Sequence, residues 1–350
     1  MNSLALLVPG PIDQLTGGYL YAQRLVEGLR AAGVRVAVHE LDGRFPEADA
    51  AACAAGEAVL GRLRDGSVAV LDGLALAGFA GCLAREAARL HVLALIHHPL
   101  ADETGIGADA AARFAALERA LLPHAAGVIC PSAHTAAAVA AYGVAPERIA
   151  VVPPGTTKPA APRRARRAGP CRLLSVATVT PRKGHRVLIA ALARLKDRAW
   201  RLRIVGSLAR DPAEVAALRT AIAAHGLGAR VSLEGEWPQD RVDEAYANAD
   251  LFVLASHHEG YGMVFAEALA HGLPIVATAG GATAETVPAA AGLLVPPGDD
   301  AALAAALADA IGDATLRARL GAAAAEAGRA LPDWSEAVRR WLEAARRLAA

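Results

Sequence analysis

The sequence lacks the features that mark several classes of protein. Its four cysteines are scattered and no two have C-x-x-C spacing, so the sequence predicts neither a disulfide framework nor a zinc site. No apolar run approaches the length that a membrane-spanning helix needs. The first residues form an apolar run without a basic flank or a cleavage-type segment, which predicts a strand and not a signal peptide. We therefore expect a cytoplasmic protein.

The chain also has no excess of charge of either sign. Lys and Arg number 36 and Asp and Glu number 35, which gives no reason to expect a nucleic-acid partner. The hydrophobic fraction of 54% is raised by alanine, which favours helices without making them membrane-bound. At 350 residues the chain is long enough for two domains.

Short apolar runs alternate with helical patterns along most of the chain. This alternation is typical of α/β proteins in which helices cover a doubly wound parallel sheet. In the first half, strands are expected at residues 4–8, 34–41, 68–71, 92–96, 127–130 and 149–152. Helices are expected at 19–32 and 46–64, and an Ala-rich helix before each of the last three strands. In the second half, strands are expected at 173–177, 202–205, 231–233, 251–255 and 274–277, with helices at 184–195, 213–225 and 264–271.

The alternation breaks between the two halves. Residues 156–170 are rich in proline and arginine and have no hydrophobic period, which predicts a linker between a first domain, 1–155, and a second, 171–332. Four arginines lie in this linker: Arg163, Arg164, Arg166 and Arg167. They suit either a solvated linker or a peripheral contact with the anionic inner face of a membrane. A final helix with one apolar face is expected in 333–350.

Residues 251–278 are the most informative stretch. They have the pattern of strand, glycine loop, helix and strand, and in such a unit the loop lies at the carboxyl ends of parallel strands, where ligands bind. Gly260 and Gly262 would let backbone amides and the following helix N-terminus approach an anion such as a diphosphate. Glu259 and Glu267 could accept hydrogen bonds from hydroxyls. Together these groups suit a sugar nucleotide, although either glutamate by itself also fits a solvated surface position.

The string EGYGMVFAEALAHGLPIVAT resembles the donor-site motif of family 4 glycosyltransferases, in which seven residues separate two glutamates. The resemblance implies the GT-B fold, with two Rossmann-like domains facing a central cleft and a final helix that crosses back to the first domain. It also implies a retaining transferase that uses a UDP-, GDP- or ADP-sugar. No metal, no cofactor and no protein nucleophile are implied.

In the second domain, the segment SVATVTPRKGHRVLIAAL resembles the family element whose Arg and Lys neutralise the diphosphate leaving group. Lys183 matches the lysine. Thr178 stands where the family has its arginine, so the chain departs from the pattern there. Arg182 is the candidate to supply the missing charge, because a guanidinium pairs with phosphate oxygens. The other interpretation of Arg182 is a solvated residue at a helix start.

The resemblance assigns Glu259 to the transferred sugar and Glu267 to the ribose. Trp237 is placed near the nucleotide base, where it either stacks on the base or simply packs. The remaining candidates for donor binding in this loop are Gly260, Tyr261, Gly262, Met263 and Val264.

In the first domain, Gly17 and Gly18 lie between the first strand and a helix expected to begin at about Tyr19. A glycine pair there either brings amides to a phosphate or merely connects the two elements. The resemblance implies that the pair faces the donor diphosphate. It also places His97, at the end of the strand 92–96, against the transferred sugar, with His98 as the alternative. Both histidines also fit purely structural roles.

The sequence thus predicts a retaining glycosyltransferase that transfers a sugar from a nucleotide sugar to a small-molecule, glycan or lipid-linked acceptor. The candidate catalytic residues are His97, Lys183 and Glu259, and catalysis is expected to be mainly electrostatic. The departure at Thr178 supports a rival, a non-catalytic nucleotide-sugar-binding partner of the same fold. A phosphorylase or an epimerase with the GT-B fold is the alternative among enzymes.

Overall fold

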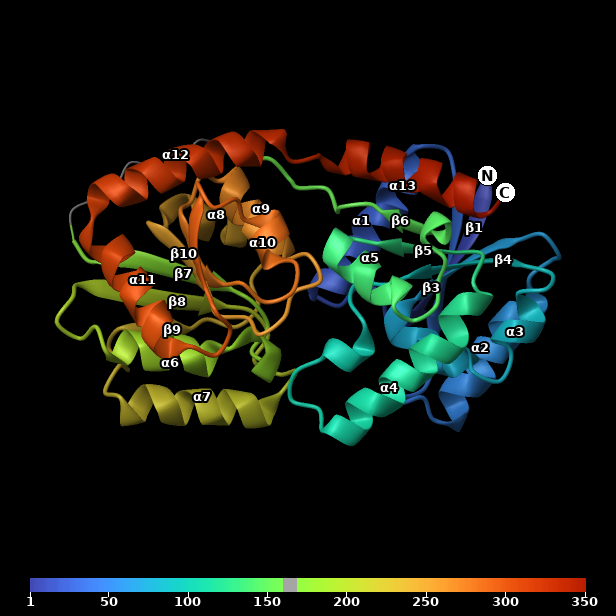
Figure 1. The fold of residues 1–350 in the computed structure, drawn as a ribbon, viewed down its shortest axis with the longest axis horizontal. Coiled ribbons are helices and arrows are strands. Elements are labelled where there is room, and N and C mark those ends of the chain that lie inside the picture. Colours follow the sequence, from blue (N-terminus) through green and yellow to red (C-terminus); the bar gives the residue numbers. More distant parts are fainter. Residues whose placement is uncertain (160–168) are drawn as a thin grey trace. The chain divides into compact units, whose positions relative to one another are not determined.

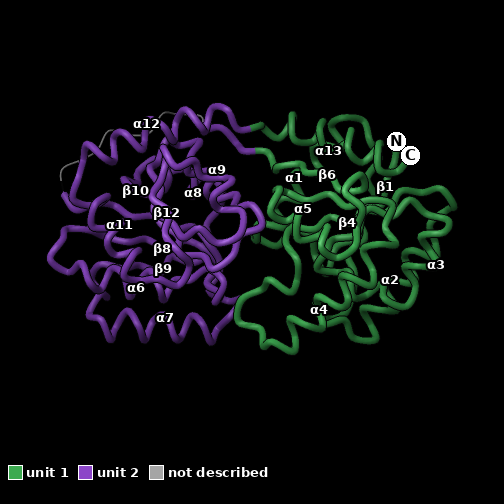
Figure 2. Tube along the Cα trace, viewed as in Figure 1, with its two compact units in different colours: residues 1–155, 332–350 green, residues 156–331 purple. Residues whose placement is uncertain are grey.

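The computed structural model describes residues 1–159 and 169–350. The described chain divides into two compact units, one of residues 1–155 with 332–350 and one of residues 156–331 (Figure 2). Each unit is built on a six-stranded sheet in which every strand pairing is parallel. The expected α/β fold with two Rossmann-like sheets is therefore confirmed. Residues 160–168 of the predicted linker, with all four of its arginines, lie outside the described residues.

Unit 1 has the strand order β2-β1-β3-β4-β5-β6. Figure 1 labels β1, β3, β4, β5 and β6 of this sheet. Its strands are β1 (Ser3–Pro9), β2 (Arg35–Leu41), β3 (Val68–Asp72), β4 (His91–Leu95), β5 (Gly127–Cys130) and β6 (Ile149–Val151). Its helices are α1 (Gly17–Ala31), α2 (Ala50–Arg62), α3 (Leu83–Glu86), α4 (Ala108–Leu121), α5 (Ala133–Ala140) and α13 (Trp334–Leu348). The strand order reverses between β1 and β3, and ligands of open α/β sheets bind at such a reversal.

Several predicted helices of unit 1 need correction. Helix α1 begins at Gly17, two residues before the predicted start. Helix α2 begins only at Ala50, because the Asp49 side chain accepts a hydrogen bond from the Ala52 amide and caps the helix there. The Ala-rich helix predicted before β4 is wrong, since a 3-10 segment (Gly73–Phe79) and the short α3 occupy that place. Glycines at 73, 78 and 81 disfavour a continuous helix there.

Helix α13 packs closely against the rest of unit 1. A Cβ atom added to Gly28 of α1 would lie 2.5 Å from Cγ2 of Val338, and one added to Gly127 of β5 would lie 2.7 Å from Cβ of Leu348. Trp341, on the same helix, is 1% exposed. Glycine is therefore required where α1 and β5 meet this helix, because no space is left for a side chain.

Unit 2 has the strand order β12-β11-β10-β7-β8-β9. Its strands are β7 (Cys171–Val176), β8 (Trp200–Val205), β9 (Val231–Leu233), β10 (Leu251–Leu254), β11 (Ile275–Thr278) and β12 (Gly292–Val295). Its helices are α6 (His185–Ala193), α7 (Pro212–Ala224), α8 (Gln239–Asn248), α9 (Met263–Ala270), α10 (Thr283–Thr286), α11 (Asp300–Gly312) and α12 (Ala314–Ala330). Here the strand order reverses between β7 and β10.

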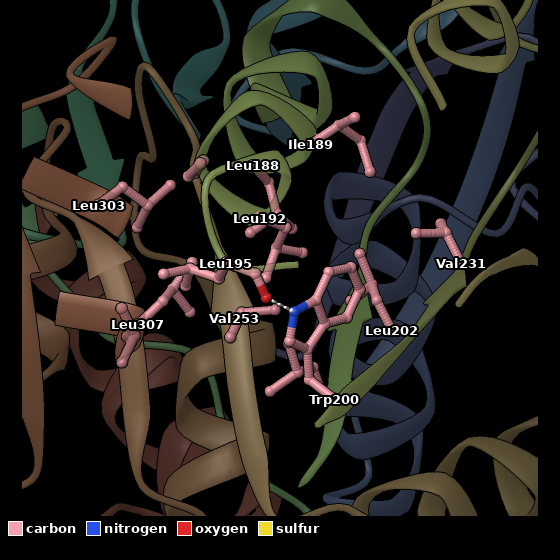
Figure 3. Packing of buried hydrophobic residues seen from close by; sticks show 14 of the residues in the cluster. Leu188, Ile189, Leu192, Leu195, Trp200, Leu202, Val231, Val253, Leu303 and Leu307 are labelled. Atoms are coloured by element: carbon pink, nitrogen blue, oxygen red, sulfur yellow. Dashed lines mark hydrogen bonds between the residues drawn. The ribbon is translucent and has the colours of Figure 1, made fainter. Parts of the chain in front are cut away.

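Both faces of the unit 2 sheet are buried. Along β10, Leu251 and Val253 belong to one hydrophobic cluster, whereas Phe252 and Leu254 belong to the cluster on the other face. In the first cluster, the indole N–H of Trp200 donates to the Leu195 carbonyl at 2.8 Å (Figure 3). The continuous apolar strands that suggested a parallel sheet are thus explained by burial on both sides. Among the helices of the described residues, none is long and apolar enough to cross a membrane.

The packing of α13 generates a prediction for Gly28. The change Gly28→Ala should lower the free energy of unfolding by about 1–3 kcal/mol, because the added methyl group overlaps Val338. Denaturant unfolding measures the loss. Gly61→Ala is the matched control, since Gly61 also lies in a helix but a Cβ atom there would meet open space. There alanine should stabilise by up to about 1 kcal/mol, and equal effects of the two changes would contradict the close packing.

Candidate active site

Three loops of unit 2 meet at the carboxyl ends of the adjacent strands β7, β10 and β11. The amide of His257 donates to the Arg182 carbonyl at 2.8 Å, and the amide of Ala282 donates to the Glu259 carbonyl at 2.7 Å. Gly184, with φ of +61°, lies so close to the next loop that a Cβ atom there would be 1.9 Å from the Ala255 carbonyl oxygen. The backbones of the three loops are therefore in direct contact at the reversal of strand order.

The carboxylate of Glu259 lies at the centre of these loops, and the residue is 4% exposed. Lys183 Nζ lies 2.7 Å and 2.9 Å from its two oxygens, and the Ser256 hydroxyl donates to Oε1. Arg182 Nη1 lies 3.6 Å from Oε2 and donates to the His258 carbonyl at 3.0 Å. The structure thus brings together Lys183 and Arg182, predicted to face the diphosphate, and Glu259, predicted to face the transferred sugar.

Electrostatics keeps Glu259 ionised. Burial alone would raise its pKa, but the charges of Lys183 and Arg182, with the hydrogen bonds from Lys183 and Ser256, lower the pKa to about 2. Two positive charges and one negative charge leave this cluster with a net charge of +1. The Arg182 side chain is only 17% exposed, so it is not the solvated helix-start residue of the alternative interpretation.

Helix α9 begins beside Glu259. Gly262 has φ of +82° and precedes the first helical residue, Met263. The first amides of a helix have no partner within that helix, so this N-terminus offers donors and a positive dipole end. Residues 260–264, predicted to bind the donor, therefore lie at a helix N-terminus that could contact an anion.

Glu267 lies one turn into α9 and is partly buried. The Tyr246 hydroxyl of α8 lies 2.8 Å from Glu267 Oε2 and 3.3 Å from the Val264 carbonyl oxygen. Burial, with a smaller contribution from Asp243, raises the pKa of Glu267 to about 7, although the Tyr246 hydrogen bond acts in the opposite direction. The pKa of Glu267 is therefore raised, whereas that of Glu259 is lowered.

Trp237 is partly buried, and two arginines contact its ring. The guanidinium carbon of Arg241 lies 3.7 Å from the centroid of a Trp237 ring, and that of Arg203 lies 5.3 Å from it. The indole also packs against the hydrophobic cluster that contains Tyr246. A base could stack on Trp237 only beside or in place of these cations.

In unit 1 the predicted residues gather at the reversal between β1 and β3. A Cβ atom added to Gly18, in the first turn of α1, would lie 3.4 Å from the His97 ring, whereas Gly17 has open space around it. His97 Nε2 lies 3.5 Å from Oδ2 of Asp72, the last residue of β3. The His97 ring also packs edge-on against Tyr21, with centroids 5.3 Å apart. Its Nε2 atom makes no hydrogen bond within the described residues.

His98 has a different environment. Its Nε2 atom lies 3.4 Å from Glu103 Oε2, in the segment that follows β4. His97 therefore lies with the glycine pair and Asp72, and His98 lies beside Glu103.

Sequence reasoning missed three polar residues of these sites: Asp72, Tyr246 and Ser256. Asp72 directly follows a predicted strand, as His97 does, and that shared position at the carboxyl edge of a parallel sheet could have revealed it. Ser256 begins the glycine loop, next to the predicted Glu259. No sequence pattern identified Tyr246 as a site residue, because a tyrosine on the apolar face of a helix is usually a core residue.

Two family models match the chain. A family model described as "Glycosyl transferase 4-like domain" matches residues 16–155, and one described as "Glycosyl transferases group 1" matches residues 160–327. Together the two models account for most of the chain.

Curated relatives match about half of the chain. The D-inositol 3-phosphate glycosyltransferase of Acidothermus cellulolyticus is 35% identical over 199 residues, which is 51% of this chain and 44% of that protein. The putative colanic acid biosynthesis glycosyltransferase WcaL of Escherichia coli K12 is 37% identical over 150 residues, covering 40% of this chain and 36% of that protein. The matched part thus spans half the length of these relatives or less.

Solved structures share the fold over nearly the full chain. Sucrose-phosphate synthase from Thermosynechococcus elongatus has a TM-score of 0.84 and 23% identity, with 99% of each chain covered. Anabaena Alr3699/HepE, solved in complex with UDP and glucose, has a TM-score of 0.77 and 20% identity, with 98% of each chain covered. At these identities the likeness concerns the fold. The solved structures show the GT-B fold, and the two family models show that the chain belongs to the family 4 glycosyltransferases.

Proposed function

We propose that this protein transfers a sugar from a nucleoside-diphosphate sugar to an acceptor with retention of the anomeric configuration. One observation carries the proposal: a cluster with a net positive charge, formed by Lys183, Arg182 and Glu259, lies beside the N-terminus of α9. Fixed positive charge and helix amides at one place suit the growing negative charge of a departing diphosphate. Glu267, one turn further along α9, suits the ribose hydroxyls.

In this proposal Lys183 and Arg182 stabilise the leaving group without a metal ion. Glu259 has two tasks: it contacts the transferred sugar and it holds Lys183 in place. Arg182 supplies the charge that Thr178 does not, since its guanidinium lies within the same cluster.

In this proposal the acceptor is a small molecule, a glycan or a lipid-linked acceptor, and the names of the relatives support the first two classes. Those relatives include proteins named for inositol 3-phosphate and for colanic acid biosynthesis. A cytoplasmic location, with peripheral contact at the inner face of a membrane, also belongs to this proposal.

A thermal-shift screen with UDP, GDP and ADP tests donor binding first. A nucleotide present at one hundred times its Kd should stabilise the fold by about 2.7 kcal/mol. Hydrolysis and transfer are then measured with sugars of the nucleotide that binds, and the anomeric configuration of the product is read by NMR. The departure at Thr178 favours the rival, a binding protein without activity. Nucleotide binding without any hydrolysis or transfer would support that rival.

Lys183→Ala should lower kcat by ~10²-fold or more, because its contact strengthens as charge develops on the diphosphate. The measurement is kcat at saturating donor, with circular dichroism to show that the variant is folded. Lys196→Ala, a change of an exposed lysine in the same unit, should leave kcat unchanged. Near-wild-type kcat in Lys183→Ala would refute the assignment.

Glu267→Gln should weaken nucleoside diphosphate binding by about 1.5–3 kcal/mol, the usual strength of a hydrogen bond to a charged acceptor. The ribose is remote from the reacting bond, so the loss should appear in Kd and KM more than in kcat. Calorimetric titration at pH 8 measures it. The exposed Glu244→Gln on α8 is the control, and equal affinities for both variants would exclude the ribose role.

His97→Ala should reduce sugar transfer by ~10- to 10³-fold while nucleoside diphosphate binding stays normal. The nucleotide-binding candidates Lys183, Glu259 and Glu267 all belong to unit 2, whereas His97 belongs to unit 1. His98→Ala is the paired control and should have a milder effect. A loss of transfer in His98→Ala alone would move the role to His98, and no loss in either variant would make both histidines structural.

A further inference from the structure

Tyr246 is a fully buried residue that the proposed function does not use. Its hydroxyl oxygen lies 2.8 Å from Glu267 Oε2 and 3.3 Å from the carbonyl oxygen of Val264, and the residue is 0% exposed. A phenol carries a single hydrogen, so it can donate to only one of these two acceptors at a time. The position of that hydrogen therefore depends on whether Glu267 is ionised.

The Tyr246 ring is held in place by other rings. It stacks on His271, with centroids 5.1 Å apart and planes at 18°, and on Phe252, with centroids 5.8 Å apart and planes at 29°. Phe252 in turn packs edge-on against Phe265 of α9. The hydroxyl is therefore fixed relative to α9, the helix that carries Glu267.

Two arrangements of hydrogens satisfy this geometry. When Glu267 is ionised, Tyr246 donates to Oε2. Oε1, which accepts no hydrogen bond from a described residue, remains available for a ligand hydroxyl. When Glu267 is protonated, its carboxyl group can donate to the phenol oxygen, and the Tyr246 hydrogen turns to the Val264 carbonyl. Only the first arrangement leaves a full negative charge to receive ribose hydroxyls.

We propose that Tyr246 is a positioning residue for Glu267, and that nucleotide binding is coupled to the loss of one proton from Glu267. This inference rests on the proposed function, in which Glu267 receives the ribose. Burial raises the pKa of Glu267 to about 7, so both arrangements are populated near neutral pH. The nucleotide binds the ionised form of Glu267, whereas burial favours the protonated form. The affinity for the nucleotide should therefore rise as the pH increases through this value.

Other charged groups face this pair from two helices. On α8, Asp243 adds to the rise of the Glu267 pKa. At the end of α9, His271 Nε2 lies 3.9 Å from Asp243 Oδ1, and burial lowers the pKa of His271. Where α12 packs along α9, the close contact is made by the uncharged Gly328. Burial and Glu267 raise the pKa of Tyr246 far above neutral pH, so the phenol keeps its hydrogen.

Carbon-13 NMR of the glutamate carboxyl groups tests the first half of the proposal without a ligand. Glu267→Gln identifies the resonance, and its titration midpoint is compared between wild type and Tyr246→Phe. Loss of the hydrogen bond to the ionised form should move the midpoint upward. An unchanged midpoint would overturn the positioning role.

Calorimetric titration with UDP, GDP or ADP between pH 6 and pH 9 tests the second half. The affinity of wild type, divided by that of Glu267→Gln, should rise about tenfold from pH 6 to pH 8, since the ionised fraction rises by that factor. Dividing by the affinity of Glu267→Gln cancels the pH dependence that comes from titration of the nucleotide phosphate itself. A ratio that does not change with pH would overturn the coupling, and this comparison does not require Tyr246→Phe to fold.

Tyr246→Phe should bind several-fold more weakly than wild type at pH 7 and approach wild type at pH 9. In the Glu267→Gln background the same change should have no pH-dependent effect. Tyr142→Phe, which alters a partly buried tyrosine of unit 1, is the control and should leave the pH profile unchanged. If wild type binds none of the three nucleotides, the proposed function fails, and the NMR titration still decides whether Tyr246 controls Glu267.

Discussion

The buried carboxylate of Glu259 is the constraint on which the unit 2 site depends. A buried carboxylate without partners would be strongly destabilising, so its position requires Lys183, Arg182 and Ser256 around it. These partners come from the loop after β7 and from the loop after β10. One ion-pair cluster therefore fixes two loops that are far apart in the sequence, and it keeps two cations at a place where a diphosphate could use them.

Glycine makes this arrangement possible. Gly281 has φ of +59°, and a Cβ atom there would lie 2.3 Å from the Glu259 carbonyl oxygen, just as one at Gly184 would overlap Ala255. The loops therefore meet backbone to backbone, with no side chain between them. A glycine also allows a close contact in unit 1, where Gly18 lets the His97 ring lie against the first turn of α1. In each unit the functional candidates gather where the strand order reverses.

Much of the fold could be predicted from the sequence, because buried parallel strands and amphipathic helices have distinct periods. Where a predicted helix boundary was wrong, a local side-chain interaction determined the observed one. In α2, for example, Asp49 caps the helix and sets its first residue. Glu259, Lys183 and Glu267 could be identified because motif spacing reports positions along the chain. Their pairing could not, since spacing does not report which side chains touch. Tyr246 lies 21 residues before Glu267 and could not be connected with it, because only the packing of α8 on α9 brings them together.

The close packing of α13 has a consequence for how the protein is made. Unit 1 consists of residues 1–155 and 332–350, so its last helix leaves the ribosome only after the whole of unit 2. At typical rates of synthesis, residues 156–331 take roughly 10 to 35 s to appear. During that interval the surfaces of α1 and β5 at Gly28 and Gly127 have no partner. Unit 1 therefore cannot complete its packing until the last residues of the chain have been synthesised.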